Sequence, residues 1–109
     1  MSIPSYVQMI SPLLQFLGHQ TTSVPTILIH EEVAQLVGLT EEEKTQLLPS
    51  KTQQVYKNRI GWAHDALKRA KLSSSPKRGE WQLTEEGRKL HTKFPDGLPL
   101  EECKKISLT

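Results

Sequence analysis

The segment 55–72 constrains the fold more than any other part of this 109-residue chain. Its sequence, VYKNRIGWAHDALKRAKL, repeats apolar residues at three- and four-residue spacing, which is the pattern of a helix with one buried face. We expect a helix over about residues 53–71, with Ser50 or Thr52 as its cap. The buried stripe comprises Tyr56, Ile60, Ala63, Leu67 and Ala70, widened by Val55, Trp62 and Ala66.

The opposite face of this helix is polar and basic, and it contains a glycine. Its members are Gln54, Lys57, Asn58, Gly61, His64, Asp65 and Lys68. A glycine inside a helix costs about 1 kcal/mol relative to alanine, so some gain should offset it. Two interpretations stay open: the missing Cβ lets a ligand approach the backbone, or it lets another element of the protein pack closely.

The charge of the chain is segregated along the sequence. The net charge is only +2, but residues 51–78 contain eight Lys or Arg and one acid, Asp65. Residues 26–47 contain five Glu and one Lys, so the positive field belongs to one segment. Such segregation indicates an anionic partner. The alternative is a solvated helix face that is basic by chance.

Composition excludes several classes of protein. The length suits one domain, and no apolar run approaches the roughly 20 residues that a membrane span needs. No basic region precedes an apolar segment at the start, so we expect no signal peptide. The lone Cys103 predicts no internal disulfide, and no Cys/His cluster has zinc spacing. A cytoplasmic location without a membrane partner is expected.

The sequence lacks the motifs of a catalytic site. It contains no Gly-rich phosphate loop, no GxSxG and no HExxH, and its acids lie at helix starts where capping explains them. We therefore expect no enzymatic activity of this chain, no cofactor and no metal.

The remaining elements follow from periodicity and turn residues. Helices are expected over residues 4–17 (kinked at Pro12), from Pro25 to Gly38, and from the capping box of Thr40 and Glu43 to about Leu48. A short strand could lie in residues 19–24. Residues 72–83 predict a hairpin with a basic tip, followed by a helix capped by Thr84. The tail from residue 95 reads as a linker or a frayed end.

This order of elements is that of a winged helix-turn-helix domain: a mainly α (α+β) fold of three to five helices with a small C-terminal hairpin wing. We assign it to residues 1–94, with residues 95–109 as a flexible tail. Trp62 and Trp81 are expected to be its main hydrophobic anchors, and Tyr56 is expected in the core. His64 is expected to lie on the exposed face without a role in proton transfer.

A helix of this diameter fits the major groove of DNA, where its first turns meet base edges. For Arg59 an internal hydrogen bond is as well supported as a DNA contact, and Asp65 argues against DNA at the C-terminal half of the face. Lys77 and Arg78 suit a phosphate or minor-groove clamp. The candidate DNA-binding residues are Lys51, Thr52, Gln53, Gln54, Lys57, Asn58, Arg59, Gly61, Lys68, Lys77 and Arg78.

Several stretches resemble one known family. VYKNRIGWAHDALKRAKL followed by RGEWQLTEEG, together with IPSYVQMISPLLQFL and GLTEEEKTQLLPS, is similar to the amino-terminal domain of Mrr-type (type IV, modification-dependent) restriction endonucleases. The likeness covers about residues 3–94 and is most specific in the run from Tyr56 to Ala63.

The resemblance implies a winged-helix module that binds double-stranded DNA in a bacterial restriction system. In the family this module precedes a nuclease domain that cleaves methylated DNA, and no such domain is present in this chain. DNA reading is carried over to Lys57, Asn58, Arg59, Lys77 and Arg78. The alternative is a protein-interaction or homodimerisation module, with residues 24–28 and the acidic second helix as its surface.

Overall fold

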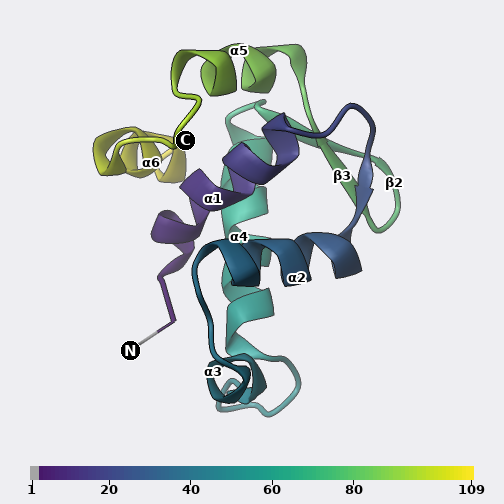
Figure 1. The fold of residues 1–109 in the computed structure, drawn as a ribbon, viewed down its shortest axis with the longest axis vertical. Helices are drawn as coiled ribbons and strands as arrows, with labels where there is room; N and C mark the ends of the chain where they lie inside the picture. The colour runs from purple at the N-terminus through teal and green to yellow at the C-terminus, as the bar shows by residue number, and fades with distance from the viewer. Residues whose placement is uncertain (1–2) are drawn as a thin grey trace.

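The computed structural model describes residues 3–109, which form six helices and one small antiparallel sheet (Figure 1). The predicted mixture of helices with a small sheet is confirmed. The elements are α1 (Tyr6–Gly18), β1 (Val24–Pro25), α2 (Thr26–Leu36), α3 (Glu41–Thr45), α4 (Val55–Arg69), β2 (Ser73–Lys77), β3 (Glu80–Leu83), α5 (Glu85–Lys93) and α6 (Leu100–Ser107).

Helix α1 is the centre of the core. It begins at a capping box, in which Ser5 and Gln8 exchange side-chain-to-backbone hydrogen bonds. The helix continues through Pro12, as expected from the apolar residues on both sides of it. It contacts α2, α4, α5, α6 and β3, and Figure 1 shows it lying across α4. Its buried residues are Met9, Ile10, Leu13, Leu14 and Leu17.

The sheet has the strand order β1-β3-β2, so the first strand pairs with the last. Val24 lies opposite Trp81, and Ser73 lies opposite Leu83. The hairpin turns through Arg78 and Gly79, whose φ of +79° favours glycine. The N–H of Thr26 donates to the Gly79 carbonyl over 2.9 Å. The tip of the hairpin is therefore fixed to the start of α2.

The chain between α3 and α4 differs from the prediction at both ends. Helix α3 stops at Thr45, and α4 starts only at Val55. In between, a bridge pairs Leu47 with Gln54, and the Val55 N–H donates to the Gln46 carbonyl. These backbone pairs close residues 47–54 into a loop, and Gln54, which is extended, takes the cap position without a side-chain hydrogen bond.

Neither hydroxyl that was expected to cap α4 does so. Ser50 and Thr52 are exposed, and their hydroxyl oxygens lie 2.8 Å apart, hydrogen-bonded to each other. The physical reason is that the bridge before Val55 moves the first helical turn beyond the reach of both side chains.

Residues 95–109 do not form the linker or frayed end that was expected. Leu98, Cys103 and Ile106 are buried, and α6 packs against both α1 and α4. The Leu98 N–H donates to the Ser11 hydroxyl over 2.9 Å. An eight-residue helix is not stable alone, so packing rather than local preference decides this element.

Candidate nucleic acid interface

Helix α4 buries one side against α1 and leaves the other uncovered. The stripe predicted to be buried is confirmed at Tyr56, Ile60, Ala63 and Leu67, each at most 1% exposed. We call the uncovered side the outer face of α4. It comprises Gln54, Lys57, Asn58, Gly61, Trp62, Asp65, Lys68 and Arg69, all exposed or half-buried.

His64 is not on this outer face, contrary to expectation. Its side chain is 4% exposed and stacks on the ring of Trp81 in β3, with ring centroids 3.9 Å apart and planes 4° apart. The edge of α4 that carries His64 therefore packs against the sheet. The sheet buries His64, although helical periodicity alone predicts that His64 is exposed. Burial, helped by the charge of Lys68, lowers the pKa of His64 to about 4.

Two lysines of α4 share the rim that carries His64. Lys57 precedes His64 by seven residues and Lys68 follows it by four, which places all three along one side of the helix. Their charges are felt by neighbouring groups. The charge of Lys68 helps to lower the pKa of His64. In α2, burial and the charge of Lys57 lower the pKa of His30 to about 4. Both lysines therefore lie at the border between α4 and the sheet or α2.

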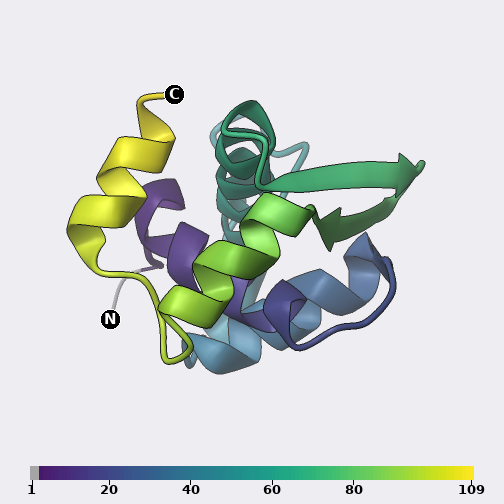
Figure 2. The same cartoon turned by 90° about the horizontal axis from the view of Figure 1, so that it is seen from above.

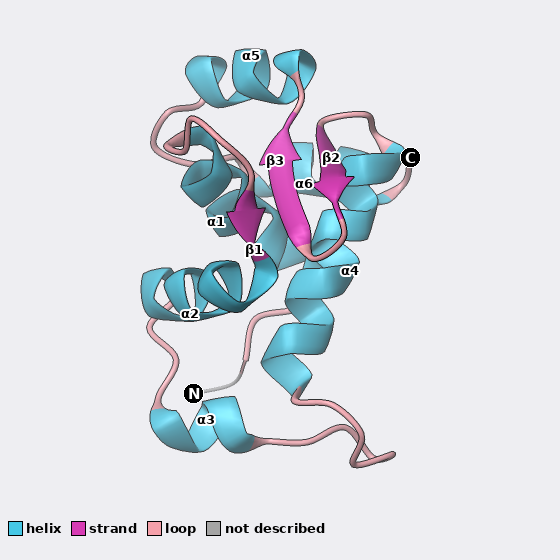
Figure 3. Cartoon of the chain, turned by 90° about the vertical axis from the view of Figure 1, so that its right-hand side faces the viewer, coloured by secondary structure: helices cyan, strands magenta, loops and turns pink. Residues whose placement is uncertain are grey.

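The tip of the hairpin carries two more cations. Lys77 and Arg78 are exposed, while the backbone beside them is held by β1 and α2. Figure 2 shows the hairpin projecting from the C-terminal end of α4. In Figure 3 the sheet and α4 lie side by side. Within residues 3–109, no carboxylate lies within 4.0 Å of the amino or guanidinium nitrogens of Lys57, Lys68, Lys77 or Arg78.

Polar side chains gather at the start of α4. The Asn58 amide donates to the side-chain oxygen of Gln53 over 3.2 Å. Thr52 is exposed beside them, and Lys51 is exposed with a left-handed φ of 58°. Asn and Gln amides present the donor and acceptor pair that matches an adenine edge. Lys51, Thr52 and Gln53 are thus exposed directly before the cap residue Gln54, and Asn58 follows in the first turn of α4.

Arg59 belongs to the interior network instead. Its guanidinium donates to the carbonyl oxygens of Ile3 and Pro4 over 2.5 and 3.2 Å. Of the two alternatives that the sequence left open, the internal hydrogen bond is the one present. Because α1 and the segment before it pack along this side of α4, Arg59 points away from the outer face.

The acid on the outer face is neutralised. Asp65 forms an ion pair with Arg69 one turn later. Arg69 also donates to the carbonyl oxygens of Thr109 and Ser107 over 3.1 and 3.5 Å, which ties α4 to the end of α6. The pair therefore leaves Lys68 as the unpaired charge on the C-terminal half of the outer face in the described chain.

Gly61 has open space in front of it. Within residues 3–109, apart from its chain neighbours and the backbone of its own helix, no atom lies within 4 Å of the point where a Cβ would sit. The interpretation that another element of the protein packs on Gly61 is thus not supported in the described part of the chain.

Trp62 was expected in the core but is 55% exposed. It follows Gly61 directly and lies at the edge of the apolar stripe, where one helical position decides between core and solvent. Trp81, by contrast, is half-buried and packs against the core. Sequence reasoning missed Trp62 as a surface residue because no local signal separates the two tryptophans.

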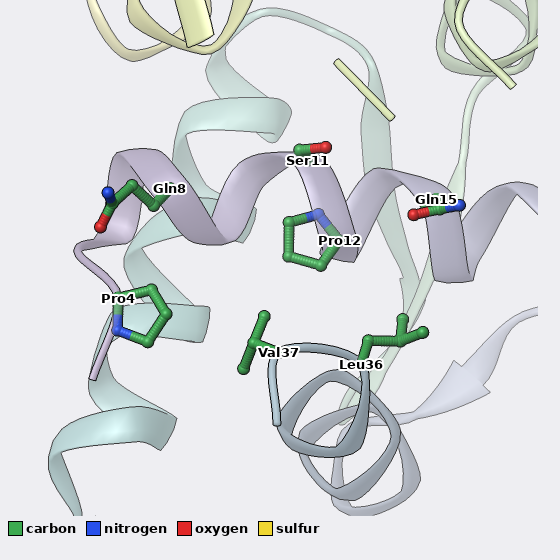
Figure 4. Close-up of a pocket in the computed structure, with 7 residues that line it drawn as sticks. All are labelled: Pro4, Gln8, Ser11, Pro12, Gln15, Leu36 and Val37. Carbon is green, nitrogen blue, oxygen red and sulfur yellow. The ribbon is translucent and has the colours of Figure 1, made fainter. Parts of the chain in front are cut away.

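A pocket of about 420 Å³ lies elsewhere, between α1 and the end of α2 (Figure 4). No titratable side chain lines it, and the hydroxyl of its serine already accepts the N–H of Leu98. The pocket therefore offers no acid–base chemistry. Its lining residues are Pro4, Gln8, Ser11, Pro12, Gln15, Leu36 and Val37.

Over the part of the chain that the structure describes, no three His, Cys, Asp or Glu side chains are gathered as metal ligands. None of the helices in residues 3–109 has the length and apolar content that a bilayer crossing requires.

These features define a small helical domain with a three-stranded sheet, whose α4 and hairpin tip carry four cations without a carboxylate partner in residues 3–109. Residues 6–93 match the Mrr N-terminal domain, and the chain belongs to that family. It is 42% identical over 87 residues to a protein of Escherichia coli (strain K12), the type IV methyl-directed restriction enzyme EcoKMrr. The match covers 80% of this chain and 28% of that relative. No solved structure matches the chain.

Proposed function

We propose that this chain is a winged helix-turn-helix module that binds double-stranded DNA. Helix α4 is the recognition helix in the major groove, and the β2–β3 hairpin is the wing on the DNA backbone. The observation that supports this most directly is that four cations of α4 and the hairpin tip, Lys57, Lys68, Lys77 and Arg78, have no carboxylate partner within residues 3–109.

The order of elements supports the winged-helix assignment. A helix, a short strand, two further helices, the long α4 and a hairpin follow one another, and β1 joins the hairpin to close the sheet. A helix is about 10–12 Å across and the major groove is about 12 Å wide, so α4 can enter with its outer face toward the bases. Lys51, Thr52, Gln53 and Asn58 at its start are then placed to meet bases and phosphates.

The family relationship supports DNA as the partner. The Escherichia coli relative is a methyl-directed restriction enzyme, and this chain spans only 28% of its length. We propose that the module works in a restriction system, delivers a nuclease domain of a longer parent chain to its substrate, and recognises methylated DNA. The location in the cytoplasm stays a prediction.

Salt dependence of binding tests the proposal. If the surface meets about four to six phosphates, log K should fall against log salt with a slope of about −4 to −5. The double variant Lys57→Ala/Lys68→Ala should bind more weakly and reduce the slope by about 2. A matched control, Lys104→Ala/Lys105→Ala, removes the same charge from α6 and should change binding much less.

Two outcomes would contradict the assignment. Equal losses in both double variants would mean that net charge, not this surface, governs binding. A folded wild-type chain with no affinity for any duplex at low salt would remove the proposed function altogether.

Dimerisation is the second candidate, because Ile27 and Leu28 at the start of α2 are 80% and 47% exposed. Sedimentation with and without a duplex separates the two. A stable dimer that is indifferent to DNA would favour the interaction module.

A further inference from the structure

The outer face of α4 contains one large apolar side chain beside one missing side chain. Trp62 presents more than half of its indole to solvent, and the adjacent Gly61 leaves the helix backbone uncovered. Asn58 lies three residues before Gly61 and Asp65 four residues after it, so both border the same spot. Gly61 and Trp62 are consecutive, so they project about 100° apart around the helix. We call the uncovered backbone at Gly61, with the exposed indole beside it and polar residues one turn before and after it, the notch.

The fold itself makes no use of this notch. Nothing in the described chain approaches Gly61, although a glycine weakens the middle of a helix. Over half of the Trp62 surface likewise stays out of the core. Packing within residues 3–109 therefore does not explain Gly61, and it explains Trp62 only in part.

The surroundings of the notch indicate which molecule approaches. The cations Lys57 and Lys68 lie on the same helix, and the one acid on the outer face, Asp65, is neutralised by Arg69. This charge pattern complements a polyanion. In the major groove of DNA the base edges are polar, with one apolar exception, the C5 methyl group of a pyrimidine.

We propose that Gly61 and Trp62 form a contact site for the C5 methyl group of a pyrimidine, with the α4 backbone at Gly61 as the closest point to the base edge. The inference rests on the proposed function, since it needs α4 in the major groove. Thymine and 5-methylcytosine carry the same group at the same position, so either base fits this chemistry.

The test uses one set of mixed-sequence duplexes in three forms: unmodified, with uracil replacing thymine, and with 5-methylcytosine replacing cytosine. Dissociation constants are measured by fluorescence anisotropy at one salt concentration for the wild type, Gly61→Ala and Trp62→Ala. Leu36→Ala is the matched control, because Leu36 is also 55% exposed but lies at the end of α2 beside the groove of Figure 4.

The wild type should bind the methyl-bearing duplexes about fourfold more tightly for each methyl group it contacts, the effect of burying one such group. Weaker binding of the wild type to the uracil duplex than to the unmodified one identifies thymine as the source of the methyl group. Tighter binding to the 5-methylcytosine duplex than to the unmodified one identifies the modified base. Both α4 variants should lose this preference while remaining folded, and Leu36→Ala should retain it. The thermal midpoint of Gly61→Ala should rise, which separates weaker binding from unfolding.

Three results would overturn the inference while the proposed function stands. In the first, the wild type binds all three duplex forms equally. In the second, the α4 variants bind each form like the wild type. In the third, the α4 variants lose affinity equally for every form, which would indicate a contact with the DNA backbone. A wild type that binds no duplex in any form would instead remove the proposed function on which the inference rests.

Discussion

Helices α1 and α4 are the two longest in the described chain, and their surroundings differ. Helix α1 contains no charged residue and is contacted by four helices and a strand. Helix α4 carries five charged residues and leaves its outer face uncovered. Each also contains one residue that disfavours a helix. Pro12 of α1 lines a pocket together with Leu36, the last residue of α2, and Val37 that follows it, whereas Gly61 of α4 faces open space.

The difference separates structural from functional demands. Burial explains the sequence of α1, because nearly every apolar residue in it meets another element. Burial explains only half of α4, since the notch and the free lysines do nothing for stability. Substitutions in the two helices should therefore have opposite consequences, and this contrast can be tested directly.

The largest expected effect is in α1. Leu14 is 1% exposed, so Leu14→Ala should lower the free energy of unfolding by about 2–5 kcal/mol through lost burial and a cavity. Urea denaturation measures the loss. A change below about 1 kcal/mol would mean that α1 is not the centre of the core.

The buried rim of α4 should make stability depend on pH. His64 has a pKa of about 4 in the folded chain and about 6.5 when unfolded. The contribution of neutral His64 to the free energy of unfolding is fully present above pH 6.5. It is lost as the pH falls from 6.5 through 4, which lowers the free energy of unfolding by up to about 3 kcal/mol. His30 has the same shift, so it adds to the loss over the same range.

The variant His64→Phe isolates this contribution. Phenylalanine keeps the stacking on Trp81, and the Nε2 atom that it removes has no hydrogen-bond partner within residues 3–109. Denaturation curves between pH 7 and pH 4 should therefore show a shallower pH dependence than those of the wild type. An unchanged pH dependence would contradict the assignment to His64.

A smaller effect tests whether α6 belongs to the domain. Ile106 is 7% exposed against α1 and α4, so Ile106→Ala should cost about 2 kcal/mol in thermal or urea unfolding. Leu108→Ala is the control, because Leu108 is 86% exposed and its replacement should change stability little. Equal effects of the two substitutions would argue for a frayed tail.

The smallest effect has the opposite sign. Gly61→Ala should raise the free energy of unfolding by about 1 kcal/mol, because alanine favours the helix and the added Cβ meets no other element. Differential scanning calorimetry is sufficient to detect it. A destabilised variant would show that something does pack on Gly61.

Much of the fold could be predicted because its signals are local. Residues spaced three and four apart predicted α1 and α4, Pro25 and Gly38 bounded the helix predicted over α2, and the caps at Thr40 and Thr84 were confirmed. The hairpin followed from its turn residues. The start of α4 could not be predicted, because the pairing of Leu47 with Gln54 delays the helix and joins residues that no periodic pattern relates. Helix α6 was missed because its few apolar residues matter only against α1 and α4.

The candidate site divides in the same way. The charge segregation and the identities of Lys57, Lys68, Lys77 and Arg78 are properties of the sequence alone. Helical periodicity cannot tell that Arg59 turns toward the Ile3 carbonyl or that His64 stacks on Trp81. Trp62 and His64 exchanged their expected places, because both lie at the edges of the stripe.

The sequence by itself determined which segments become helices, which segment carries the positive charge and which family the chain resembles. These properties depend on neighbouring residues and on composition. Only the tertiary structure decided which rim of α4 the sheet covers, that residues 98–107 complete the core, and that the space before Gly61 stays open. The reason is that each of these depends on contacts between segments far apart in the chain, whose energies no local pattern contains.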